Sequence, residues 1–126
     1  MQILWEACLP KIYEYLGIIL FFWSNEHEPI HVHGEYQGHQ SKAEIVIENG
    51  SVARITIKKV PGRKPLEGTH MADFEAFVEA MGLKITEKWV DYFVYHRKVT
   101  CERITKKVNK SCLLKTLSLT SLALPI

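Results

Sequence analysis

The residues with the clearest chemical potential lie in one short stretch, residues 25–36, which reads NEHEPIHVHGEY. It holds three histidines and three glutamates. His31 and His33 are two positions apart, so a β-strand would place both imidazoles on the same face, with Cα atoms about 6.6 Å apart. We expect this shared face to point into solvent. Two imidazoles at that spacing can act on one atom, and we call them the histidine pair.

One interpretation of the cluster is a metal site. Zinc accepts histidine nitrogens and carboxylates, and three protein ligands with one open position make a catalytic centre. His27 or Glu26, in the preceding loop, could reach the histidine pair. The sequence is therefore compatible with zinc or another divalent metal bound by His27, His31 and His33.

A second interpretation is acid–base catalysis. A histidine titrates near neutral pH, so one imidazole can accept a proton while the other donates one. Cleavage of RNA through its 2′-hydroxyl needs that division of roles. Lys42 or Arg54 on neighbouring strands could hold the phosphate, and Asn25 would orient the loop through hydrogen bonds to the backbone.

A third interpretation is structural. Imidazoles on the solvent-exposed face of a strand are often solvated, or they hydrogen-bond a neighbour such as Glu35 and the loop backbone. Residue types and spacing alone leave the three interpretations open. The remaining histidines, His39, His70 and His96, are interpreted as structural or surface residues.

The strands and helices that must position this cluster follow from hydrophobic periodicity. Residues 10–17 begin with proline and end with glycine, which is typical of a short helix. Residues 18–25 are rich in β-branched and aromatic side chains and indicate a central strand. Residues 30–36 and 41–48 alternate between apolar and polar side chains, as strands do. Asn49-Gly50 then predicts a hairpin turn into a fourth strand.

The period becomes helical after a loop rich in proline and glycine at residues 61–68. Apolar side chains repeat at helical spacing on both sides of Gly82, which should end or bend the first helix. The second helix would run to Val99 or beyond. The aromatic side chains that we assign to the core are Phe74, Phe77, Trp89 and Phe93. The sequence thus predicts an α+β fold with a short N-terminal helix, a four-stranded antiparallel meander and two C-terminal helices packed on one sheet face.

The totals indicate one small domain. The chain has 126 residues, enough for one modest core, and we expect residues 1–110 to form it, followed by a leucine-rich tail at 111–126. The three cysteines include no C-x-x-C pair, which favours a reducing compartment. The longest apolar run, residues 16–23, is far shorter than the roughly 20 residues of a membrane span. We therefore expect a cytoplasmic protein without a membrane partner.

The net charge of +2 hides an asymmetry. Residues 1–50 hold seven acids and two bases, whereas residues 51–126 hold seven acids and fourteen bases. The candidates for nucleic-acid binding near the C-terminus are Lys98, Arg103, Lys106, Lys107 and Lys110. Such a stretch can contact RNA or an acidic protein partner, and a solvated helix end is the alternative.

The motif Asn-Glu-His, followed by Pro and His-x-His and then by an Ala-Glu strand, resembles bacterial domain-of-unknown-function family 4160. The matching residues are Asn25, Glu26, His27, Pro29, His31, His33, Ala43, Glu44 and, on a helix, Trp89. The sequence departs from the family pattern in having one proline where two are usual. Val32 also replaces a larger apolar residue.

The resemblance implies a small cytoplasmic bacterial protein with a protein partner, because such proteins are often encoded beside a member of unknown-function family 2442 in a toxin–antitoxin-like arrangement. Two functions are compatible with it. The chain would be a toxin that cleaves RNA at the histidine pair, or a non-catalytic interaction module that binds its partner through a sheet edge or the tail.

Overall fold

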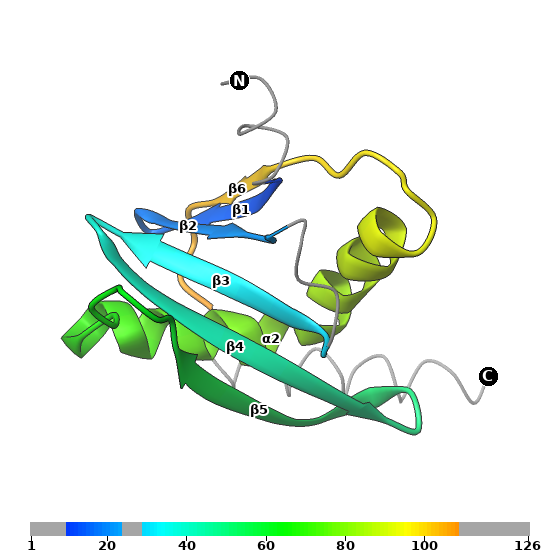
Figure 1. Cartoon of the computed structure of the whole chain (residues 1–126), viewed down its shortest axis with the longest axis horizontal. Helices are drawn as coiled ribbons and strands as arrows, with labels where there is room; N and C mark the ends of the chain where they lie inside the picture. The colour runs from blue at the N-terminus through cyan, green and yellow to red at the C-terminus, as the bar shows by residue number, and fades with distance from the viewer. Residues whose placement is uncertain (1–9, 24–28, 109–126) are drawn as a thin grey trace.

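The computed structural model describes residues 10–23 and 29–108. They form a six-stranded sheet with one face covered by a long helix (Figure 1). The strands are β1 (Lys11–Tyr15), β2 (Ile18–Phe21), β3 (His31–Tyr36), β4 (His39–Glu48), β5 (Ser51–Lys59) and β6 (Glu102–Ile104), and the helix is α2 (Gly68–Phe93). The strand order is β5-β4-β3-β2-β1-β6, so β5 and β6 are the two edges.

The predicted fold was wrong in three respects, of which the first is the N-terminal helix. Residues 11–15 form β1, which pairs antiparallel with β2. The turn between them has Leu16 at φ 50° and Gly17 at φ 86°, the left-handed conformations of a tight hairpin turn. Gly17 therefore lies in the turn that joins β1 to β2. The sequence interpretation had placed it at the end of a helix.

Second, the sheet is larger than the predicted four-stranded meander. Five strands, β1 to β5, follow one another antiparallel, and the predicted turn at Asn49-Gly50 joins β4 to β5. The sixth strand, β6, returns after α2 and pairs parallel with β1, with Tyr13 beside Glu102 and Tyr15 beside Ile104. Because β6 is only three residues long, its sequence carries no periodic signal.

Third, the described residues contain one long helix where two were predicted. The backbone leaves helical geometry at Met81, with φ −109° and ψ 15°, and α2 continues beyond this kink to Phe93, so the predicted bend next to Gly82 is confirmed. A Cβ on Gly82 would lie 2.8 Å from Val52 Cγ2, so this glycine lets α2 approach β5 closely. The predicted extension to Val99 and beyond was also wrong, since residues 102–104 are a strand.

The core lies between α2 and the sheet face that it covers. Phe74, Phe77 and Trp89 are buried, as predicted, and Phe93 is partly buried against them. The ring of Phe77 stacks on Tyr15 at 4.4 Å between centroids. No helix among the described residues has the length and apolar character needed to cross a membrane.

Ion pairs and a hydrogen bond hold the segment after α2 against the sheet and against α2. Arg103 Nε lies 3.2 Å from Glu14 Oε2, and Lys88 Nζ lies 3.2 Å from Glu102 Oε1. The backbone N–H of Val108 donates to the Tyr15 hydroxyl at 2.9 Å. The predicted tail at 111–126 lies outside the described residues, so the division of the chain at residue 110 stays a prediction.

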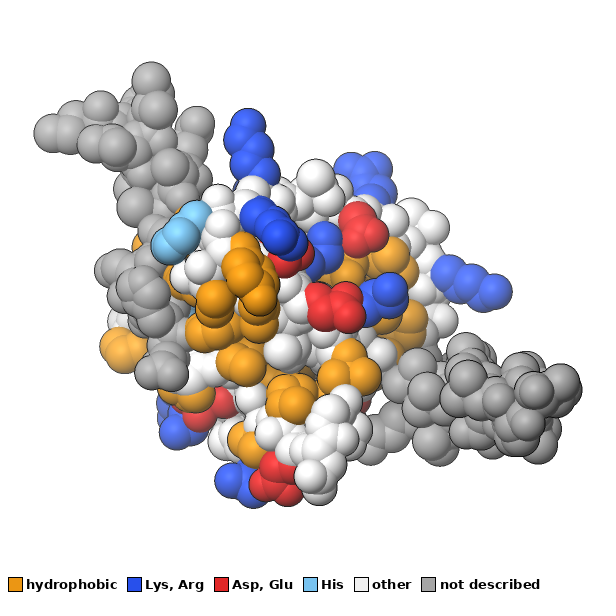
Figure 2. All heavy atoms as spheres, turned by 90° about the vertical axis from the view of Figure 1, so that its right-hand side faces the viewer, with side chains coloured by type: hydrophobic (Ala, Val, Ile, Leu, Met, Phe, Trp, Pro, Cys, Tyr) orange, Lys and Arg blue, Asp and Glu red, His pale blue; other side chains and the backbone are white. Residues whose placement is uncertain are grey.

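The chain leaves α2 with apolar side chains exposed. Val94 is 53% and Tyr95 57% exposed, and the guanidinium of Arg97 lies 4.8 Å from the centre of the Tyr95 ring. Figure 2 shows hydrophobic side chains on this side of the molecule with basic and acidic side chains around them. Charged groups therefore interrupt the exposed apolar surface here.

Candidate functional site

The histidine pair lies on the sheet face opposite α2. A Cβ on Gly34 would lie 2.4 Å from Phe74 Cε1, so Gly34 faces the helix, and its neighbour His33 points the other way. His31 and His33 share this second face, with ring centroids 5.3 Å apart and ring planes at 77°. The predicted strand alternation is therefore confirmed, and we call this surface the histidine face.

The prediction that both imidazoles point into solvent was wrong. His31 and His33 are each only 2% exposed. Phe21, beside His33 on β2, stacks on its ring at 5.4 Å, and Trp23 approaches the same ring edge-on at 6.2 Å. The pair is thus part of a packed layer on the second face of the sheet.

Hydrogen bonds fix the same tautomer in both rings when they are neutral. His31 Nδ1–H donates to the Pro29 carbonyl at 2.7 Å, and His33 Nδ1–H donates to Gln40 Oε1 at 3.1 Å. The Gln40 amide is oriented by its own Nε2–H, which donates to Glu35 Oε1 at 3.3 Å. The lone pair of each imidazole is therefore on Nε2, the atom that would act as base or metal ligand.

The arrangement of the histidine pair meets only some of the requirements for acid–base cleavage of RNA or for metal binding. Lys42 lies directly opposite His33 in the β3–β4 register, as a phosphate-binding lysine would. However, a ribose 2′-hydroxyl must reach the base to within hydrogen-bond distance, and side chains that are 2% exposed are closed to a polymeric substrate. Within residues 10–23 and 29–108, no group of three or more His, Cys, Asp or Glu side chains is placed to hold a metal ion.

The remaining predicted site residues of the motif, Asn25 and His27, lie outside the described residues. The structure therefore brings together His31 and His33 but says nothing of the loop that would complete a three-ligand site. The catalytic and metal-binding roles of these residues stay predictions.

Two of the predicted nucleic-acid-binding residues lie beside carboxylates. Arg103 pairs with Glu14, and Lys107 Nζ lies 3.8 Å from Asp73 Oδ1. Lys98 and Lys106 are exposed, and Lys110 lies outside the described residues. Since residues 102–104 form β6, these bases do not lie on a continuation of α2, and their role in nucleic-acid binding stays a prediction.

A second basic region, which the sequence interpretation missed, follows the edge strand β5. Residues 51–65 contain five bases and no acid. These bases, which we call the basic edge, are Arg54, Lys58, Lys59, Arg63 and Lys64, and all five are exposed. The sequence shows this run of positive charges, but only the order of the strands in the sheet shows that it lies on an edge strand.

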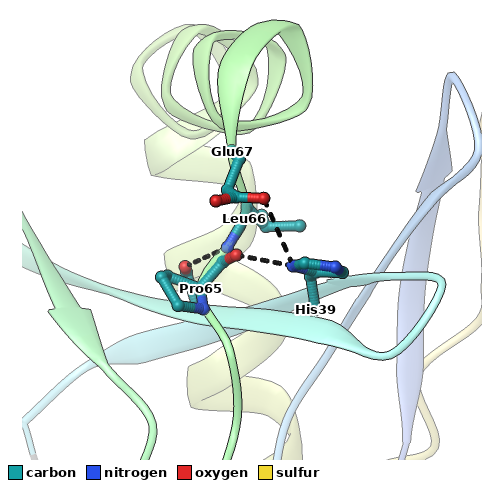
Figure 3. Close-up of polar contacts among 5 residues, drawn as sticks. His39, Pro65, Leu66 and Glu67 are labelled. Atoms are coloured by element: carbon teal, nitrogen blue, oxygen red, sulfur yellow. Dashed lines mark hydrogen bonds and ion pairs between the residues drawn. The ribbon is translucent and has the colours of Figure 1, made fainter.

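The other histidines have structural roles or lie at the surface, as expected. His39 Nδ1–H donates to the Pro65 carbonyl at 2.9 Å, and Glu67 Oε1 lies 3.9 Å from the same nitrogen (Figure 3). His70 stacks on Tyr36 at 3.7 Å, and His96 is exposed. A cavity of about 200 Å³ lies beside His39 and His70. These contacts anchor the start of α2 to the β3–β4 hairpin.

The described residues thus combine a sheet that has one helix-covered face with a histidine pair on a central strand, β3. The family described as Domain of unknown function (DUF4160) matches residues 17–90, more than half of the 126 residues. The chain therefore belongs to this family, and the resemblance inferred from the motif is confirmed. Neither the curated proteins nor the solved structures contain a match to this chain.

The network around His33 leads to a first prediction. Gln40 is 1% exposed and links His33 to Glu35, so Gln40→Leu should destabilise the protein by about 1–2 kcal/mol, because the Nδ1–H of His33 loses its acceptor. Chemical denaturation at neutral pH measures the loss. In the double variant His33→Phe/Gln40→Leu the loss should be smaller than the sum of the two single losses. A Gln40→Leu variant as stable as the original protein would contradict the network.

Proposed function

We propose that the protein is the non-catalytic interaction component of a cytoplasmic, toxin–antitoxin-like pair, and that it binds its protein partner along the edge strand β5. The observation that carries this proposal is the edge itself. β5 is nine residues long and is the last strand of the sheet order, beyond β4. Within the described residues no strand pairs with its outer side.

An edge strand of this length is a template for a further strand. Its outward N–H and C=O groups can pair with an extended segment of another protein, and such main-chain hydrogen bonds supply affinity in strand-addition complexes. The opposite edge, β6, offers only three residues. β5 is therefore the better of the two docking edges.

Burial of the histidine pair is the reason to prefer interaction over RNA cleavage. A catalytic pair must meet its substrate, whereas His31 and His33 are each only 2% exposed, and the ring of His33 is stacked against Phe21. Their hydrogen bonds to Pro29 and Gln40 support a structural role in the central strand. The resemblance suggests a partner from the family 2442 proteins encoded beside members of this family.

Hydrogen–deuterium exchange tests the proposal. The chain is measured alone and with the family 2442 protein encoded beside it. The outward amides of β5 should exchange fast in the free chain and at least about tenfold more slowly in the complex, because they gain strand hydrogen bonds. The amides of central strand β3 serve as the internal reference and should change little. Protection confined to β6 would contradict the proposed edge, and RNA cleavage that His33→Ala abolishes would contradict the non-catalytic role.

A further inference from the structure

We infer that the segment received by β5 is an acidic extended strand of a protein, with carboxylates four residues apart. This inference rests on the proposed function and specifies the chemistry of the partner. Its basis is the basic edge, where five exposed bases occur in residues 51–65 without one acid. A partner strand must neutralise this charge to pack beside it.

The strand register defines where the carboxylates belong. Arg54 lies opposite Val46 and Lys58 opposite Lys42, with Thr56 between them opposite Glu44. Because side chains alternate, Arg54 and Lys58 lie on one face of β5, about 13 Å apart along the strand. Since His31 lies opposite Glu44, this is the histidine face. Acidic residues at positions i and i+4 of an added strand would meet both bases.

The existing sheet leaves positive charge uncompensated at this edge. Lys42 and Lys58 are directly opposite each other on neighbouring strands, an arrangement in which like charges repel. Glu44 is the acid beside them, with Oε1 3.7 Å from Lys58 Nζ. One glutamate thus lies beside two lysines. A further carboxylate, on the outer side of β5, would reduce the repulsion between the two positive charges.

The loop after β5 prolongs the basic edge. Residues 60–63 form a turn in which the Arg63 N–H donates to the Val60 carbonyl at 3.1 Å. The Gln40 N–H then donates to the Lys64 carbonyl at 2.7 Å, next to the pairing of Ser41 with Lys59. Lys64 therefore continues the line of β5 along β4, and the positive charge extends past the end of the strand.

A protein strand fits this surface better than a nucleic acid. Single-stranded nucleic acids bind where aromatic side chains stack on bases beside a basic groove. Residues 51–65 include no aromatic residue, and the strongly exposed Tyr95 lies after α2. What β5 does offer is a row of backbone donors and acceptors, and an extended polypeptide can pair with both, whereas phosphate groups accept hydrogen bonds but have none to donate to the carbonyls.

Fluorescently labelled peptides test the inference on the full chain. Each is nine residues long, the length of β5, with capped ends and alternating threonine and valine. One carries two glutamates four residues apart, and the matched control carries glutamines there. The glutamate peptide should bind about tenfold more tightly by fluorescence anisotropy, and the difference should shrink at high salt.

Charge variants locate the interaction. Arg54→Glu/Lys58→Glu should remove the preference for the glutamate peptide, and Arg54→Gln/Lys58→Gln should reduce it. Lys11→Glu/Lys84→Glu has the same change in net charge at exposed positions outside β5 and should keep the preference. Circular dichroism and denaturation verify that each variant is folded. Loss of the preference in the Lys11/Lys84 variant would overturn the inference, because it would show that overall charge alone is responsible.

Two further outcomes separate the inference from the proposed function. If both peptides protect β5 from exchange equally well, the edge binds strands but the inferred acidity is overturned. If single-stranded RNA binds more tightly than the glutamate peptide and the Arg54/Lys58 variants abolish that binding, the protein partner itself is overturned. Tighter binding of the glutamate peptide, with protection of β5, supports both.

Discussion

Gly34→Ala is expected to destabilise the protein by about 2–3 kcal/mol through overpacking of the core. An alanine Cβ at this position would lie 2.4 Å from Phe74 Cε1 and 2.6 Å from Cδ1. Neither side can yield easily. Gly34 is paired with Leu20 on one side and Ser41 on the other, and Phe74 is fully buried. The strain should therefore outweigh the roughly 0.5–1 kcal/mol that alanine gains over glycine in a strand.

Denaturation by urea measures this loss, and a double variant identifies its cause. Phe74→Leu removes the ring that meets the new Cβ, so Gly34→Ala should cost less in the Phe74→Leu background than alone. Gly38→Ala is a useful comparison, because no atom lies within 4 Å of its new Cβ and its cost comes from the positive φ of 85°. Additive losses for Gly34 and Phe74 would show that the close contact is not the cause.

Local sequence patterns correctly predicted the strands around the histidine pair, because the alternation of side chains and the turn signal agree with the faces and hairpins of the sheet. Residues 31–36 alternate, and His31 and His33 do share a face. Asn49-Gly50 is a strong turn signal and it does join two strands. Leu16-Gly17 and Gln37-Gly38 adopt the same positive-φ pairs, but a leucine or glutamine before glycine is a weaker signal of such a turn.

The errors arose where contacts distant in sequence decide the structure. Residues 11–15 fit a helix or a strand equally well over so short a run, and pairing with β2 and β6 selects the strand. Gly82 interrupts the local helical signal, and α2 does kink beside it at Met81, but the helix then continues to Phe93. β6 is determined by the strand beside it, since residues 102–104 pair with residues 13–15.

The same distinction applies to the candidate sites. Alternation predicts which side of β3 the imidazoles take, but it does not predict that Phe21 and Trp23, from outside β3, pack against the ring of His33. The basic run at residues 51–65 was present in the sequence, yet a charge run on a central strand and one on an edge strand look alike. Only the sheet order places this run where a partner strand can reach it.

Raising the pH from 10 to 12 is expected to remove about 2 kcal/mol of stability through Tyr13. Burial, together with the negative charges of Glu102 and Glu87, raises the pKa of this phenol from 10.0 to about 12. In the unfolded chain the phenol loses its proton near its ordinary pKa, whereas in the folded chain it keeps it. The contribution is thus fully present below pH 10 and is lost as the pH rises to 12, at about 1.4 kcal/mol per pH unit.

Tyr13→Phe isolates this effect from the other groups that titrate at high pH. The variant lacks the phenol, so the difference in free energy of unfolding between the two proteins should be constant up to pH 10 and should then shift in favour of the variant. At neutral pH the variant should be as stable as the original protein or up to about 1 kcal/mol more so, because within the described residues the buried Tyr13 hydroxyl has no hydrogen-bond partner. Chemical denaturation at pH 8, 10 and 11 measures both. A pH-independent difference would mean that Tyr13 ionises as easily in the folded chain as in the unfolded one, and it would contradict the prediction.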